Sequence, residues 1–136
     1  MVSSFLQLLE KRYKEQLDNK AKEYIKESKE IILVEGPWDA IRLWSYGIYN
    51  AVAVMGSALT PEQLSLAVSS AFKINVMLDS DGAGQSGANR ICEQLKPYVD
   101  VYTYSLPSGK DPDNLGFEEA WQVVSNPTRY IGKKRA

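Results

Sequence analysis

The sequence has 136 residues, enough for one globular domain with a single core, and no apolar run approaches the roughly 18 residues that span a bilayer. Its one cysteine, Cys92, and its lack of histidine exclude an internal disulfide, a Cys/His zinc site, and Ser-His-Asp or Cys-His catalysis. The net charge of −1 hides an acidic body, because residues 31–128 hold five Lys/Arg against eleven Asp/Glu and would repel nucleic acid unless cations neutralised them.

Apolar residues recur with helical and strand periods along the chain, and helices alternate with strands. The expected elements, in chain order, are a helix over 4–28, a strand over 31–34, a helix over 38–46, a strand over 51–54, a helix over 61–71, a strand over 74–78, a helix over 85–96, a strand over 99–104 and a helix over 117–124. The first three strands are apolar without alternation, as strands buried on both faces are. The fourth alternates and should lie nearer the edge of the sheet.

Local signals mark several helix ends. Gly47 should cap the end of the helix over 38–46. Thr60 and Gln63 form a capping box around Pro61, which suits the first position of a helix.

The order of elements predicts an α/β fold: a mainly parallel sheet of about four strands, flanked by helices in a Rossmann-like arrangement, with an N-terminal helix. We expect an N-terminal helical extension over 1–30, a domain over 31–125 and a basic C-terminal tail over 126–136. Such a sheet binds its ligands at the carboxyl ends of its strands.

Six carboxylates fall directly behind strand-like segments or a turn. They are Glu35 and Asp39 after the first strand, Asp79 and Asp81 after the third, and Asp111 and Asp113 behind the turn at 108–110. Because the carboxyl ends of parallel strands lie at one edge of the sheet, we expect these acids to converge on one site. Pro112 should hold its segment extended and project Asp111 and Asp113 on one side. Without histidine, a metal must be held by oxygen ligands, which favours Mg²⁺ or Mn²⁺ over zinc.

Most of these acids also have a structural interpretation. The segment 79–82 has a common turn composition, and its Asp could cap the following helix. Asp39 suits the first turn of a helix, and Asp111 and Asp113 could be turn and capping residues. Glu35 is the hardest to explain in this way, because a carboxylate at the edge of a buried layer costs several kcal/mol unless it is paired or metal-bound.

Small and basic residues near these acids predict contacts with phosphate. A glycine followed by a serine at 56–57 lets a phosphate approach the backbone, and Gly82 permits a tight turn into a helix whose first amides could bind an anion. Arg90 and Lys110 are candidate phosphate contacts, with a solvated surface role as the alternative. Trp38 could stack on a base, with packing as the alternative. The expected supporting residues are Gly36, Asp39, Gly56, Ser57, Gly82 and Lys110.

The motifs at the strand ends resemble those of the Toprim domain, which topoisomerases, primases and several nucleases share. The residues that carry this resemblance are EGPWD at 35–39, MGS at 55–57 and DSDGAG at 79–84. The sequence is more similar still to bacterial-type, DnaG-like primases, through ILVEG at 32–36, GSALT at 56–60 and LPSGKDPD at 106–113. Residues 17–30 also resemble the stretch that leads into that domain.

The resemblance implies a Toprim fold and a role for each acid. The implied metal ligands are Glu35, Asp79, Asp81, Asp111 and Asp113. Glu35 is also implied as a general acid or base, Asp79 and Asp81 as the pair that binds catalytic Mg²⁺, and Asp39 as a supporting acid. The implied reaction is nucleotidyl transfer from NTPs, which makes RNA primers on a single-stranded DNA template. The implied partners are a replicative helicase or other primase domains.

The sequence departs from a full primase in two respects. The zinc ribbon needs Cys and His that this chain lacks, and the residues before Glu35 are too few for the basic subdomain that grips the template. We therefore expect either an excised catalytic domain or a small stand-alone protein. A Mg²⁺-dependent nuclease is one alternative, because the same carboxylates can activate water, and a non-catalytic replication accessory is another. Without a signal-peptide pattern, the expected location is the cytoplasm, away from membranes.

Overall fold

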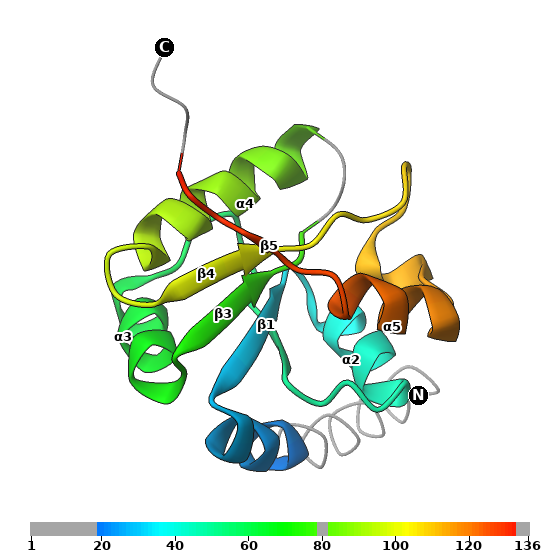
Figure 1. The fold of residues 1–136 in the computed structure, drawn as a ribbon, viewed down its shortest axis with the longest axis horizontal. Helices are drawn as coiled ribbons and strands as arrows, with labels where there is room; N and C mark the ends of the chain where they lie inside the picture. The colour runs from blue at the N-terminus through cyan, green and yellow to red at the C-terminus, as the bar shows by residue number, and fades with distance from the viewer. Residues whose placement is uncertain (1–18, 79–81, 133–136) are drawn as a thin grey trace, which may run out of the picture.

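The computed structural model describes residues 19–78 and 82–132, which form one five-stranded sheet with helices on both faces (Figure 1). In chain order the elements are a helix over 19–28, β1 (Glu30–Val34), α2 (Pro37–Ser45), β2 (Ala51–Ala53), α3 (Pro61–Ser70), β3 (Lys73–Val76), α4 (Gly82–Leu95), β4 (Asp100–Thr103), the 3₁₀ turn η1 (Pro112–Asn114), α5 (Phe117–Val124) and β5 (Thr128–Arg129). The strand order is β2-β1-β3-β4-β5, and only β5 runs antiparallel to its neighbour. The predicted α/β fold is confirmed.

The central strand β1 explains why the apolar strands lack alternation. It lies between β2 and β3, with Leu33 opposite Val52 on one side and Val76 on the other. Residues 31–34 are each at most 5% exposed, because helices cover both faces of the sheet. A strand in this position has no solvent-facing side on which polar residues could recur.

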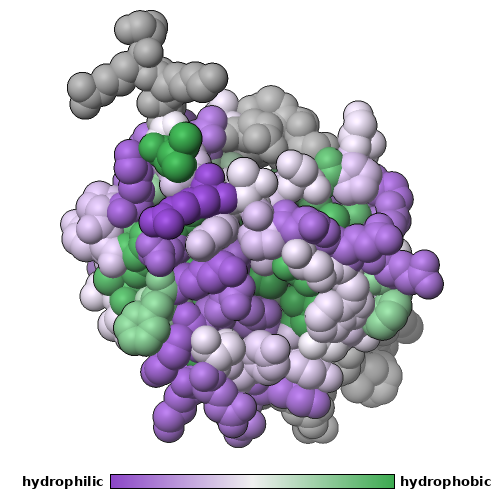
Figure 2. All heavy atoms as spheres, in the orientation of Figure 1, coloured by the Kyte–Doolittle hydropathy of each residue, from purple (hydrophilic) through white to green (hydrophobic). Residues whose placement is uncertain are grey.

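Two apolar clusters join the layers. α3 and α4 cover one face of the sheet, and α2 and α5 cover the other (Figure 1). The fully buried members include Ile74, Ile91 and Leu95 in the first cluster, and Val34, Leu43 and Ala120 in the second. The helix over 19–28 contributes Ile25 to the first cluster and Ala21 to the second. The surface in Figure 2 is accordingly mostly hydrophilic, with apolar atoms in small separate patches.

The predicted helix ends are confirmed. Gly47 has a φ of +87°, and its N–H donates to the carbonyl of Trp44 at 3.0 Å, beyond the end of α2. At the start of α3, Thr60 Oγ1 accepts from the Gln63 N–H at 3.1 Å, and Gln63 Oε1 accepts from the Thr60 N–H at 2.9 Å. The structure thus contains the reciprocal capping box.

Two details differ from the sequence-based expectation. α4 begins at Gly82 rather than at residue 85. β5 lies inside the segment assigned to a basic tail, where Arg129 pairs with Asp100 at 3.3 Å. A strand of two residues is too short to leave a periodic pattern, so no sequence signal predicts it. Among residues 19–78 and 82–132, none of the helices combines the length and apolar character that a membrane span needs.

Candidate active site

The strand ends bring the expected site segments to one edge of the sheet. Directly beyond β1 and β2, the Met55 N–H donates to the Glu35 carbonyl at 2.7 Å. Directly beyond β3, the Met77 N–H donates to the carbonyl of Leu33 in β1 at 2.8 Å. Glu35, the loop after β2 and the segment that leads to residue 79 therefore leave the sheet side by side, where parallel α/β sheets bind ligands.

Glu35 has an exposed side chain. The expectation that it stands at the edge of a buried layer and needs a partner is wrong, because the chain turns outward at Gly36, the N-cap of α2. Its carboxylate is therefore solvated and accessible to a cation or a substrate. The neighbouring Trp38 is also 56% exposed, so packing does not account for it.

Asp39 is the most constrained acid of the described site. It is only 9% exposed, and its two oxygens accept from two backbone amides: Oδ2 from Gly36 and Oδ1 from Asp113, both at 3.1 Å. Burial raises the pKa of Asp39, and the charges of Asp111 and Asp113 raise it further, while the two amides lower it. The carboxylate ties the start of α2 to the loop after β4, 74 residues away in the chain.

The loop after β4 contains the 3₁₀ turn η1, not the extended segment expected around Pro112. Asp111 is its N-cap: Oδ1 accepts from the Asn114 N–H at 3.1 Å, and the Asp111 N–H donates to Asn114 Oδ1 at 2.9 Å. Proline fixes φ at a value that suits a first helical position as well as an extended chain, and the reciprocal cap decides between them. The capping interpretation of Asp111 is thus confirmed.

Arg42 supports the same loop from α2. Its Nε donates to the carbonyl of Asp113 at 3.0 Å and lies 3.5 Å from Oδ1 of that residue. Asp39 and Arg42 therefore hold Asp113 from one helix face, three residues apart. The Asp113 carboxylate, held among the described residues by this ion pair alone, retains lone pairs for a cation.

Lys110, expected near phosphate, is anchored on α5. Its Nζ lies 2.7 and 2.8 Å from the two carboxylate oxygens of Glu119. The bond from Lys110 lowers the pKa of Glu119, and the amide of Gly116 lowers it further. The sequence offered no signal for this pair, because it does not show how α5 packs beside the loop.

α4 holds the loop after β2 along one helix stripe. A Cβ placed on Gly87 would lie 3.3 Å from Ser57 Cβ, so the helix and the loop are in close contact. Arg90 Nη1 donates to Ser57 Oγ at 3.1 Å. Gln94 donates from Nε2 to the Leu59 carbonyl at 2.9 Å and accepts with Oε1 from the Leu59 N–H at 2.8 Å. Sequence reasoning singled out Arg90 but missed Gly87 and Gln94, although their spacing of three and four residues could have grouped them.

The start of this loop is conformationally unusual. Met55 has a φ of +66° and is 69% exposed, and residues other than glycine rarely adopt this left-handed region. A Cβ on Gly56 would meet nothing closer than the Ala58 carbonyl at 3.9 Å, so packing within the protein does not require a glycine there. Unfavourable backbone conformations cluster at functional sites, and an open glycine leaves room for a ligand beside the main chain.

The central pair of the expected metal site, Asp79 and Asp81, lies outside the described residues. In the part of the chain that the structure describes, no three Asp, Glu or Cys side chains are grouped closely enough to hold a metal ion. The donor chemistry fits Mg²⁺ or Mn²⁺, because the chain has no histidine and burial raises the pKa of the Cys92 thiol to about 12. The metal ligands themselves stay a prediction.

The pattern of the Toprim-like family matches residues 32–115, which is more than half of the chain. The chain belongs to the Toprim-like family. The match runs from β1 to the residue after η1, so it includes Glu35 and Asp39 as well as the turn with Asp111 and Asp113.

The proteins most informative about this Toprim-like chain are DNA primases. The DNA primase of Aquifex aeolicus is 41% identical over 111 residues, and the match covers 78% of this chain and 22% of that protein. The DNA primase of Clostridium acetobutylicum is 39% identical over 106 residues, with 74% and 18% covered. These matches confirm the resemblance to DnaG-like primases. The chain spans about a fifth of the length of these relatives.

Solved structures agree with the sequence relatives. The zinc-binding and RNA polymerase domains of the Aquifex aeolicus primase match with a TM-score of 0.73 at 39% identity, covering 81% of this chain and 28% of that one. A DnaG catalytic core matches with a TM-score of 0.71 at 28% identity, covering 83% and 39%. The Toprim-like sheet and its helices are therefore those of primase cores.

Proposed function

We propose that this chain is the Toprim catalytic part of a DNA primase, which joins NTPs into RNA primers on a single-stranded DNA template. The observation that carries the proposal is the Toprim-like match over 32–115 in a chain whose relatives are DNA primases. A DnaG primase catalytic domain bound to ssDNA, 28% identical with a TM-score of 0.65, supports the choice of template. Other primase domains or a replicative helicase would be partners, in the cytoplasm.

The carboxylates at the strand ends would have different roles in this reaction. Mg²⁺ or Mn²⁺ would be held by carboxylates of the set Glu35, Asp79, Asp81, Asp111 and Asp113. When bound, the cation stabilises charge on the transferred phosphate and lowers the pKa of the attacking hydroxyl. Glu35, solvated at the end of β1, can accept or return a proton at its carboxylate. Asp39 positions Asp113 through its backbone amide.

The metal assignment is tested by Mn²⁺ titration of the whole chain, followed by calorimetry or by the spin resonance signal of free Mn²⁺. We expect Asp79→Asn and Glu35→Gln each to weaken Mn²⁺ binding at least about tenfold, because each removes a negative charge and a ligand oxygen. The matched control is Asp100→Asn, since Asp100 lies at the amino end of β4 and pairs with Arg129. Unchanged affinity in Asp79→Asn would make the assignment wrong.

An activity assay separates the proposed function from its alternatives. The chain is incubated with Mn²⁺, a single-stranded template and labelled NTPs, and separately with Mn²⁺ and labelled nucleic acid alone. Labelled primers that disappear with Asp79→Asn support a primase. Cleavage without NTPs indicates a nuclease, and NTP binding without either product indicates an accessory protein.

Arg90 is expected to contact phosphate at this site. Two of the described arginines, Arg42 and Arg129, pair with an Asp, whereas no carboxylate within residues 19–78 and 82–132 pairs with Arg90. We expect Arg90→Ala to weaken binding of a labelled NTP or oligonucleotide about threefold to tenfold, because an arginine–phosphate contact is a charge-assisted bond. Arg129→Ala is the control. Equal losses in both variants would show a non-specific charge effect.

A further inference from the structure

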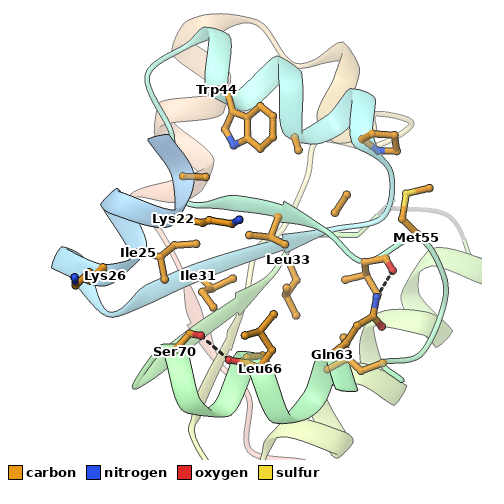
Figure 3. Close-up of a pocket in the computed structure, with 18 of the residues that line it drawn as sticks. Lys22, Ile25, Lys26, Ile31, Leu33, Trp44, Met55, Gln63, Leu66 and Ser70 are labelled. Atoms are coloured by element: carbon orange, nitrogen blue, oxygen red, sulfur yellow. Dashed lines mark hydrogen bonds between the residues drawn. The ribbon is translucent and has the colours of Figure 1, made fainter. Parts of the chain in front are cut away.

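A groove of about 830 Å³ runs along the outer edge of β2, and one of its ends reaches Pro37 and Met55 beside the candidate active site (Figure 3). Its walls come from three helices and its floor from the strands. The helix over 19–28 contributes Ile25, α2 contributes Trp44 and α3 contributes Leu66, while Ile31 and Leu33 lie between them (Figure 3). The groove therefore joins the two apolar layers at the point where the sheet ends.

The backbone of β2 is open toward this groove at Ala53, whereas the outward carbonyl of Ala51 accepts from Trp44 Nε1 at 2.9 Å. β2 is the first strand of the sheet, so it has a neighbour on one side only. Val34 of β1 lies opposite Ala53, and the Val54 N–H donates to the Val34 carbonyl at 2.8 Å. In a parallel ladder, Val34 then bonds to the residues on either side of Ala53 and not to Ala53 itself. The N–H and C=O of Ala53 therefore point away from β1. Neither group has a hydrogen-bond partner among the residues that the structure describes.

The lining combines apolar surface with charge of one sign. It includes Lys22, Lys26 and Lys29 but no Asp or Glu. Leu66, on the α3 wall, is 68% exposed, although an aliphatic side chain gains from burial. In Figure 3, Lys22 extends from the helix toward the strands and Lys26 lies at the outer end. The groove thus suits an apolar segment that carries negative charge where it lies beside the helix over 19–28.

We propose that the groove accepts an extended segment of another protein, apolar beside β2 and acidic beside the helix over 19–28, which adds to the sheet as a strand. The added backbone would bond to Ala53, and its side chains would pack alternately toward Trp44 and Leu66. A second copy of this chain, paired through the same edge, is the alternative occupant that the experiments below distinguish. This segment would stabilise the edge of the sheet at β2.

The probe is a fluorescein-labelled peptide, Asp-Glu-Val-Leu-Val-Leu-Glu-Asp with a C-terminal amide, titrated with the whole chain by fluorescence anisotropy. Two further peptides serve as controls, one with lysines in place of the four acids and one with proline in place of the first leucine. We expect the lysine peptide to bind at least about fivefold more weakly, because it meets like charges. The proline peptide should also bind more weakly, because proline removes a backbone donor.

Two variants locate the binding. Leu66→Glu should weaken the acidic peptide about tenfold or more, since it places a charge on the apolar wall. Phe72→Glu is the matched control, because Phe72 is 75% exposed and does not line the groove. The double variant Lys22→Glu with Lys26→Glu should reverse the preference, so that the lysine peptide binds more tightly than the acidic one.

Amide hydrogen exchange distinguishes strand addition from simple adhesion. With bound peptide, exchange at the Ala53 N–H should slow at least about tenfold, because that amide acquires an acceptor. Equal binding of the three peptides, full binding to Leu66→Glu, or unchanged exchange at Ala53 would each overturn the proposal. Dimerisation of the chain that Leu66→Glu abolishes would also overturn it in favour of a second copy.

Discussion

Asp39→Ala should lower the free energy of unfolding by about 3 kcal/mol, since it removes two hydrogen bonds to a charged group. The amides of Gly36 and Asp113, each 3.1 Å from the carboxylate, would lose their acceptor in a partly buried place. Asp39→Asn should cost about half as much, because its single oxygen can accept from one amide only. Urea unfolding of the three proteins measures the differences.

Asp39 should also make the stability of the folded protein depend on pH, with a sign that follows from its raised pKa. The pKa of Asp39 is raised above its usual 3.8, mainly by burial. As pH falls through the raised value, the folded protein takes up a proton before the unfolded chain does, so this residue's contribution to stability increases down to about the unfolded value. The stability gap between the parent and Asp39→Asn should therefore widen in that window. A gap that narrows would contradict the raised pKa.

Asp39→Asn also separates positioning from folding. If the carboxylate holds the loop of Asp113 in place, the variant should weaken Mn²⁺ binding even under conditions where both proteins are fully folded. Asp100→Asn is again the control, because Asp100 is an exposed acid at the amino end of β4, at the other end of the strands from the candidate site. Unchanged Mn²⁺ affinity in a folded Asp39→Asn would limit Asp39 to a structural role.

Gly87→Val is expected to have the second large effect, a loss of about 2–3 kcal/mol in the free energy of unfolding. A Cβ at this position would already lie 3.3 Å from Ser57 Cβ and 3.5 Å from Leu78 Cδ1, and valine adds two methyl groups. Either α4 or the loop after β2 must move, and the bond from Arg90 to Ser57 would be lost. NTP affinity should therefore fall together with stability.

The control for this prediction lies on the same helix. Asn89 is exposed on α4, so Asn89→Val introduces the same side chain with an expected change within about 0.5 kcal/mol. Gly87→Ala should fall between the two, because the helix propensity of alanine offsets part of the contact. Equal stability of Gly87→Val and Asn89→Val would mean that the loop adapts freely to the helix.

Local patterns predicted the elements of the fold well, because each depends on residues close together in the sequence. The apolar strand at 31–34 and the capping box of Thr60 and Gln63 need no knowledge of the rest of the chain. The parallel order of strands also predicted that Glu35 and the loop at 55–57 would leave the sheet at one edge. Those predictions rest on periodicity and on the geometry of parallel ladders alone.

The parts that sequence reasoning missed depend on contacts between distant segments. The bond from Asp39 to the Asp113 amide and the pair of Lys110 with Glu119 require the packing of α2 and α5 around η1. Glu35 was expected to need a partner, because a strand end looks buried in sequence, whereas the turn at Gly36 exposes it. Sequence patterns identify which residues are acidic, but the loops decide which of them are solvated.

The buried thiol of Cys92 can report how often the layer between α4 and the sheet opens. Cys92 is fully enclosed between α4 and the sheet, and at a pKa of about 12 it holds almost no thiolate near neutrality. Alkylating reagents can reach it only when that layer separates, so the labelling rate reports how often it does so. The single cysteine also precludes a disulfide within the chain, and its burial hinders one between two copies.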